Sequence, residues 1–165
     1  MKKNVEPEFP LLSTAPREPG GETKRRARVL IAEDDYAFRD LLTFAFEDDG
    51  YEVVAVPDGY ALLEMLGTSL LSEASVKPFD LVVSDIKMPR WSGLVTLEKL
   101  SGSPMAPPII VITAFGSDEV HQRAKQAGAV TVLDKPFDMQ DLVELGRRVI
   151  TQKSARVEKP LVADA

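Results

Sequence analysis

Several charged or hydroxyl-bearing residues stand at the point where a short apolar run of the sequence ends. The carboxylates are Glu33, Asp34 and Asp85, the hydroxyl is Thr113 and the ammonium is Lys135. Runs of this kind, rich in β-branched residues, are typical of strands buried on both faces. If these strands are parallel, their carboxyl ends meet at one edge of a sheet, which is where ligands bind in open α/β folds.

Three carboxylates gathered at one edge would repel each other. Two unit charges about 4 Å apart cost roughly 4 kcal/mol at an effective dielectric near 20. Lys135 would offset one charge, and a hard divalent cation such as Mg²⁺, which prefers carboxylate, water and phosphate oxygens, would offset the rest. A carboxylate, a metal, a hydroxyl and an ammonium in one pocket are the groups needed for phosphoryl transfer. Asp85 would then be the nucleophile that forms an acyl phosphate.

Each of these residues also has a purely structural interpretation. Asp85 and the run Glu33-Asp34-Asp35 could cap the helices that follow them. Thr113 could be a loop hydroxyl, and Lys135 a solvated lysine. Their shared position at strand ends favours a single site over four unrelated features.

The elements that must position these residues follow a regular alternation. Apolar runs predict five strands, and helical spacing between them predicts five helices, so we expect a parallel sheet with right-handed crossovers and helices on both faces. Strands are predicted at 29–32, 51–56, 81–85, 109–112 and 130–133, and helices at 36–49, 60–66, about 94–100, 117–127 and 138 to about 151. The stretch 67–78 reads either as an extension of the second helix or as a long loop.

Composition narrows the class of protein. The chain has 165 residues, 44% of them apolar, no cysteine and a net charge of −6. A disulfide framework, a thiol nucleophile and a cysteine metal site are therefore excluded, and nucleic-acid binding is disfavoured.

We expect a flexible, Pro-rich and basic extension at 1–27, one folded domain at 28–152 and a flexible tail at 153–165. No signal peptide or membrane span is evident, and a cytoplasmic location is expected.

The folded part resembles the receiver domain of two-component response regulators. The motifs that carry the resemblance are LIAEDD, SDIKMP followed by SGL, VITAFGS, AGA at 127–129, and DKPF. The resemblance implies a flavodoxin-like (βα)5 fold with a five-stranded parallel sheet in the order 2-1-3-4-5. It also implies a cis bond between Lys135 and Pro136.

The resemblance further implies a role for each residue of the site. Asp85 accepts a phosphoryl group from a sensor histidine kinase or phosphotransfer protein. Glu33, Asp34, Asp85 and the backbone carbonyl of Lys87 hold Mg²⁺, with Glu33 acting through water. Thr113 and Lys135 hold phosphoryl oxygens. The protein would not be an enzyme in the usual sense, because it only gains and loses its own phosphoryl group.

Three features depart from the family pattern. Val132 stands where the family often has an aromatic switch residue, and Phe115 or a backbone shift could take its place. The segment 67–78 is longer than usual. We expect no output domain after the last helix, and therefore a stand-alone regulator that signals through a protein partner, without direct DNA binding or a membrane. The expected signalling face is made by the fourth helix, fifth strand and last helix.

Three other functions fit parts of the same residue pattern. A phosphorelay intermediate, passing its phosphoryl group to a second histidine, is the alternative within the same class; the only histidine, His121, reads as a surface residue. An aspartate-nucleophile phosphatase would need a second aspartate at 87, where Lys87 stands. A flavin or dinucleotide binder would need a Gly-rich or hydroxyl-rich loop where Glu33-Asp34-Asp35 stands. Finally, the resemblance to receiver domains implies that Lys87 and Phe115 flank the phosphoryl group, which predicts a long-lived phosphorylated state.

Overall fold

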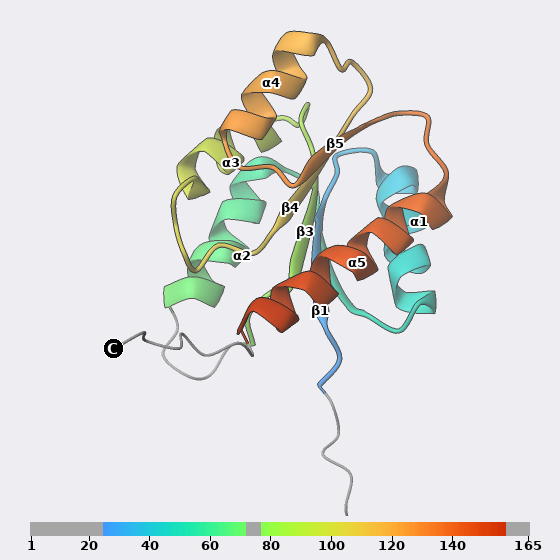
Figure 1. Ribbon diagram of the computed structural model, residues 1–165. Helices are drawn as coiled ribbons and strands as arrows, with labels where there is room; N and C mark the ends of the chain where they lie inside the picture. Colours follow the sequence, from blue (N-terminus) through green and yellow to red (C-terminus); the bar gives the residue numbers. More distant parts are fainter. Residues whose placement is uncertain (1–24, 72–76, 158–165) are drawn as a thin grey trace, which may run out of the picture.

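The computed structural model describes residues 25–71 and 77–157, and within them the chain forms a five-stranded parallel sheet with helices on both faces (Figure 1). The sheet order is β2-β1-β3-β4-β5, as predicted. The strands are β1 (Arg28–Ala32), β2 (Glu52–Val56), β3 (Leu81–Asp85), β4 (Ile109–Thr113) and β5 (Thr131–Asp134). The helices are α1 (Tyr36–Asp48), α2 (Gly59–Leu71), α3 (Gly93–Leu100), α4 (Asp118–Gln126) and α5 (Met139–Val157).

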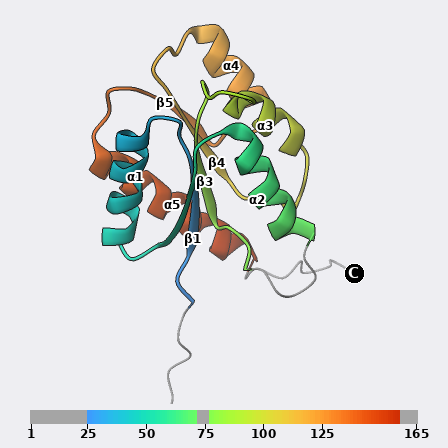
Figure 2. The same cartoon turned by 180° about the vertical axis from the view of Figure 1, so that it is seen from behind.

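The sheet separates two hydrophobic cores. Helices α1 and α5 cover one face, and α2, α3 and α4 cover the other, as the two opposite views show (Figure 2). Along β1, Val29 and Ile31 face the first core, while Leu30 and Ala32 face the second. Both faces of the strand are therefore buried, which explains why its sequence is continuously apolar instead of alternating.

Side chains at the helix starts set where each helix begins. Asp35 accepts the Phe38 N–H at 2.7 Å and caps α1, and Ser117 accepts the Val120 N–H at 3.3 Å and caps α4. Such a bond satisfies a backbone donor that the helix itself leaves unpaired. After α1 the chain turns through Gly50, whose φ of +90° is accessible to glycine at little cost.

The inward face of α1 differs from the predicted one at one position. The helical spacing of Phe38, Leu41, Leu42 and Ala45 predicts that all four face inward, but half of the Leu41 side chain is exposed (50%), while Phe46 is fully buried (0%). Helical spacing marks a face only to within one residue on either side, and the groove beside α5 leaves Leu41 uncovered. Leu42, Phe38 and Ala45 belong to the core as predicted, and Phe46 joins them.

Two helices extend further than predicted. Helix α2 runs to Leu71, which decides the open question for residues 67–71; residues 72–76 lie outside the described part. The predicted end of the last helix near Thr151 was wrong, because α5 continues to Val157. Thr151 and Ser154 place their hydroxyls on carbonyls four residues earlier, at 2.8 and 3.1 Å, and residues such as Gln152 and Lys153 are good helix formers. Residues 1–24 and 158–165, predicted to be flexible, lie outside the described residues.

None of the helices within residues 25–71 and 77–157 is both long enough and apolar enough to cross a bilayer.

Helix α4 is expected to be the least protected helix of the core. Of its residues only Ala124 is fully buried, whereas α1 buries Leu42 and Phe46. Few buried apolar contacts mean a small free energy of local opening. Amide hydrogen exchange should therefore be at least about tenfold faster in α4 than in α1, which corresponds to about 1.4 kcal/mol. Equal protection of the two helices would contradict this prediction.

Candidate functional site

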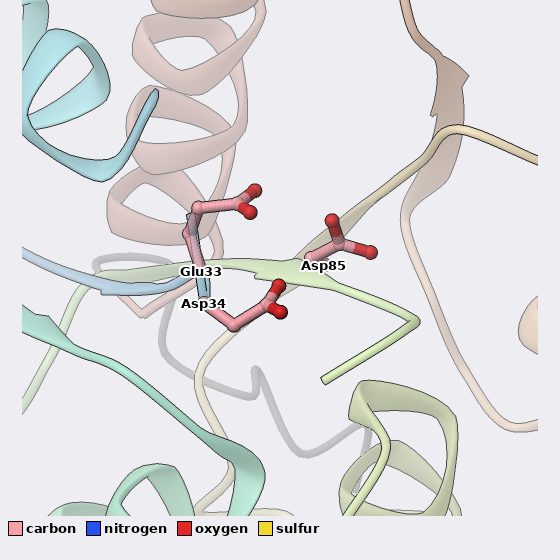
Figure 3. Close-up of side chains that lie close together, drawn as sticks. All are labelled: Glu33, Asp34 and Asp85. Carbon is pink, nitrogen blue, oxygen red and sulfur yellow. The ribbon is translucent and has the colours of Figure 1, made fainter. Parts of the chain in front are cut away.

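Three carboxylates meet at the carboxyl edge of the sheet (Figure 3). Glu33 and Asp34 follow β1, and Asp85 is the last residue of its neighbour β3. One carboxylate oxygen from each of the three lies within 4.8 Å of the others. Glu33 and Asp85 are buried and Asp34 is exposed, so the cluster has a wall inside the fold and an opening to solvent.

The Lys135 ammonium lies between two of these carboxylates. It donates to Glu33 Oε2 and to Asp85 Oδ2, each at 2.7 Å. The ammonium also lies 4.4 Å from the centre of the Phe38 ring, a cation–π distance. Lys135 directly follows β5, and its N–H donates to the Thr113 carbonyl at 2.7 Å, which holds the start of the loop against β4. The bond from Lys135 to Pro136 is cis, as predicted.

The electrostatics of the cluster favour an additional cation. Burial raises the pKa of Glu33, and the nearby Asp85 charge adds to this, although the hydrogen bond from Lys135 opposes it. For Lys135, burial lowers the pKa, but the bonds to Asp85 and Glu33 outweigh it and leave the pKa above its usual value. Both groups therefore bind protons more tightly, as expected where one ammonium faces more than one carboxylate.

The donor set suits Mg²⁺. Hard carboxylate oxygens from Glu33, Asp34 and Asp85 converge on one point, and the exposed Asp34 leaves room for water and phosphate oxygens, which Mg²⁺ retains when bound. The resemblance to receiver domains predicts Mg²⁺ in an acidic pocket of this kind.

Thr113 ends β4 next to β3, at the same edge as the acidic cluster. Its side chain is buried, and its Oγ1 accepts the Phe115 N–H at 3.1 Å. In the sheet, Asp85 is paired with Ile112, the residue before Thr113. The hydroxyl therefore belongs to the same edge as the Asp85 carboxylate, as the sequence predicted.

Lys87 contributes to the site through its backbone and its side chain. Its N–H donates to Asp85 Oδ1 at 2.8 Å, so that both oxygens of Asp85 are held, one by Lys87 and one by Lys135. The Lys87 ammonium lies 3.9 Å from the centre of the exposed Phe115 ring. The side chains of Lys87 and Phe115 thus contact each other.

A glycine allows the loop after β3 to close against Asp85. A Cβ on Gly93 would lie 2.0 Å from the Asp85 carbonyl oxygen and 2.6 Å from Ser84 Oγ. The Gly93 N–H donates to the Ile86 carbonyl at 3.0 Å. Only a residue without a side chain fits this close approach, which explains the glycine of the SGL motif.

Two supporting residues were missed by the sequence reasoning. Arg39 donates to the backbone carbonyls of Glu33 and Asp34, at 2.7 and 3.3 Å, and so fixes the acidic loop. Phe38 lies against the Lys135 ammonium. The sequence offered only a weak signal for either one, because Phe38 fits the apolar pattern of a helix and Arg39 fits its polar side.

His121 is more than the surface residue that we predicted. It is half-buried, and its Nε2 lies 3.0 Å from Asp134 Oδ1. The pair bridges α4 to the end of β5 across Gly116, where a Cβ would lie 2.5 Å from the His121 Nε2. Val132, at the position where the family often has an aromatic residue, is buried in the core under α2, α3 and α4.

Comparison with known proteins agrees with this geometry. The family model of the response regulator receiver domain matches residues 29–147. The transcriptional regulatory protein PdtaR of Mycobacterium tuberculosis is 38% identical over 117 residues, which cover 70% of this chain and 53% of the relative. The chain therefore spans about half the length of that relative.

A relative of similar size and a solved structure also match. The sporulation initiation phosphotransferase F of Bacillus subtilis is 28% identical, over 77% of this chain and 96% of the relative. A CheY-like receiver domain from Methanospirillum hungatei superposes with a TM-score of 0.69 at 27% identity, covering 80% of this chain and 99% of the other.

Proposed function

Because the chain belongs to the response regulator receiver family, we propose that it is a phosphorylation-controlled switch whose acceptor is Asp85. The observation that carries the proposal is the convergence of the Lys135 ammonium on Asp85 and Glu33, both at 2.7 Å, beside the exposed Asp34. Such a site has a nucleophile, a cation for the transferred group and an opening through which the donor can approach.

In the proposed reaction, an Asp85 oxygen attacks the phosphorus of a phosphohistidine on a sensor kinase or phosphotransfer protein. The new O–P bond forms as the N–P bond breaks, and the imidazole, which already carries a proton on its other ring nitrogen, leaves as the neutral ring. Glu33, Asp34, Asp85 and the Lys87 carbonyl would hold Mg²⁺, which would supply positive charge to neutralise the phosphoryl oxygens. Lys135 and the Thr113 hydroxyl would contact those oxygens once the group is on Asp85.

The test is labelling by a small phosphodonor such as acetyl phosphate. Wild type should gain one phosphoryl group in Mg²⁺ and none in EDTA, as measured by intact mass. Asp85→Asn should gain none while keeping its circular dichroism spectrum. The matched control is Asp58→Asn: Asp58 is also buried, but it caps α2 through the Ala61 N–H, a bond that an asparagine can also accept. Full labelling of Asp85→Asn would overturn the assignment.

Downstream, we propose that phosphorylation changes the surface formed by α4, β5 and α5 and so controls a protein partner in the cytoplasm. The thin apolar face of α4 and the His121–Asp134 bond that ties it to β5 support this, because both can be rearranged at low cost. Direct DNA binding is not part of the proposal, in keeping with the net charge of −6.

A phosphorelay intermediate is the second candidate. It is favoured by the match to a phosphotransferase over 96% of that relative's length. Incubating the phosphorylated protein with histidine phosphotransfer proteins distinguishes the two: a relay intermediate passes the label to a histidine, whereas a terminal switch retains it.

We expect the phosphorylated state to be long-lived. Phe115 is exposed beside the acceptor, with the Lys87 ammonium 3.9 Å from its ring, and neither side chain can orient an attacking water as a carboxylate or amide would. Phe115→Ala and Lys87→Asn should each speed the loss of the phosphoryl group several-fold, measured as the decay of the phosphorylated mass after the donor is removed. Phe44→Ala, which removes an equally exposed aromatic ring on α1, serves as the control. Unchanged or slower decay in both variants would contradict the shielding argument.

A further inference from the structure

A groove of about 510 Å³ runs between α1 and α5, the two helices that lie side by side on one face of the sheet (Figure 1). Its apolar lining is formed by Leu41, Phe44, Ala45, Met139 and Val143. Phe44 is 67% exposed and Leu41 is 50% exposed. Two adjacent large apolar side chains open to solvent at the rim of a groove are typical of a surface that another chain segment covers.

The groove is continuous with the place where the N-terminal segment joins the fold. Arg25, the first described residue, is anchored by an ion pair with Asp80 at 2.7 Å. Arg25 and Thr151 of α5 line one hollow. Thr151 and Arg147 line a second hollow, and Arg147 also lines the groove. These hollows follow α5 from its C-terminal half towards its start.

The segment that precedes Arg25 can reach the groove and has suitable residues. Phe9, Leu11 and Leu12 are clustered around Pro10, in a stretch that is otherwise mostly polar. Leu12 precedes Arg25 by thirteen residues, which extend to about 43 Å at most. The helix from Thr151 back to Met139 is only about 18 Å long.

The other apolar pair outside the described residues, Leu161-Val162, is too close to the end of α5. Leu161 lies four residues beyond Val157 and extends about 13 Å. Val143 lies about 21 Å back along the helix from Val157. The N-terminal cluster is therefore the one whose tether spans the distance.

We propose that residues 9–12 of the same molecule pack into the α1–α5 groove. Phe9, Leu11 and Leu12 cover Phe44 and Leu41, while the residues between Leu12 and Arg25 follow α5.

Disulfide trapping tests the proposal, and the natural chain contains no cysteine that could interfere. Ser13→Cys is combined with Gln140→Cys at the groove, or with Gln126→Cys on α4 as the control. Both glutamines are exposed, so neither change disturbs the core. Docking raises the effective concentration of one thiol near the other. The groove pair should therefore oxidise to an intramolecular disulfide at least about tenfold faster than the control pair.

A second variant separates docking from random encounter. Adding Phe9→Ser, Leu11→Ser and Leu12→Ser to the groove pair leaves the tether length unchanged and should reduce its oxidation rate to that of the control pair. Equal rates for the two original pairs, or no effect of the three serines, would overturn the proposal. A covalent dimer whose yield rises with protein concentration would also overturn it and would assign the groove to a second copy of the chain.

Discussion

Lys135→Met is expected to reduce phosphorylation by a small phosphodonor by about 10²-fold, the usual loss when one preorganised charge contact to a transition state is removed. The ammonium is the one cation seen to bond Asp85 in the described part of the chain, at 2.7 Å, and methionine keeps its length without its charge. The measurement is the initial rate of mass gain at saturating Mg²⁺. Lys125→Met, an exposed lysine of α4, should leave the rate unchanged.

The same substitution should also destabilise the fold in the absence of Mg²⁺. Glu33 and Asp85 would be left buried beside each other with no ammonium, which should lower the free energy of unfolding by about 2 kcal/mol. The loss is smaller than for a fully enclosed pair because the Lys135 side chain is 20% exposed to solvent. Since burial raises the pKa of Glu33, that carboxyl takes up a proton as the pH falls. The loss of stability is therefore greatest at a pH where both carboxylates are ionised, and it becomes smaller as the pH falls.

Urea unfolding at several pH values measures this difference. Addition of Mg²⁺ should restore part of the lost stability of Lys135→Met, because a cation bound to the cluster replaces the missing charge. A stability loss that is equal at all pH values and insensitive to Mg²⁺ would show that Lys135 acts only through packing.

Phe46→Ala is expected to lower the free energy of unfolding by about 3–5 kcal/mol. Its side chain is fully buried and lies edge-on to Tyr51, with ring centres 5.7 Å apart. It also packs where the absence of a side chain on Gly146 allows α5 to approach, since a Cβ there would lie 3.0 Å from the Phe46 ring. Removing the ring leaves a cavity at the junction of α1, α5 and the sheet.

Phe44→Ala, two residues away in the same helix, is the matched control. Phe44 is 67% exposed, so its truncation should cost about 1 kcal/mol or less. Chemical denaturation of both variants gives the comparison. Similar losses for the two would mean that α1 packs on the sheet in a different rotation from the one described.

The two phenylalanines show where sequence patterns reach their limit. In the stretch Leu41-Leu42-Thr43-Phe44-Ala45-Phe46, apolar residues are so dense that several helix faces fit the pattern. The existence of α1 was evident, but its rotation was set by the contact with α5, which lies a hundred residues later in the chain. The error over Leu41 and the overlooked Phe46 have this one cause.

By itself, the sequence determined where the strands lie and which residues stand at their ends, namely Glu33, Asp34, Asp85, Thr113 and Lys135. The order of the parallel strands followed from the resemblance to a known family. A strand buried on both faces must be continuously apolar, so the first polar residue after it is conspicuous. Tertiary structure alone decided how these side chains are connected: that Lys135 bonds both Glu33 and Asp85, and that the Lys87 ammonium lies over the Phe115 ring. It also paired His121 with Asp134 and left Phe44 open beside α5. These contacts join residues from separate elements, and their geometry follows from how the helices pack on the sheet, which local periodicity does not encode.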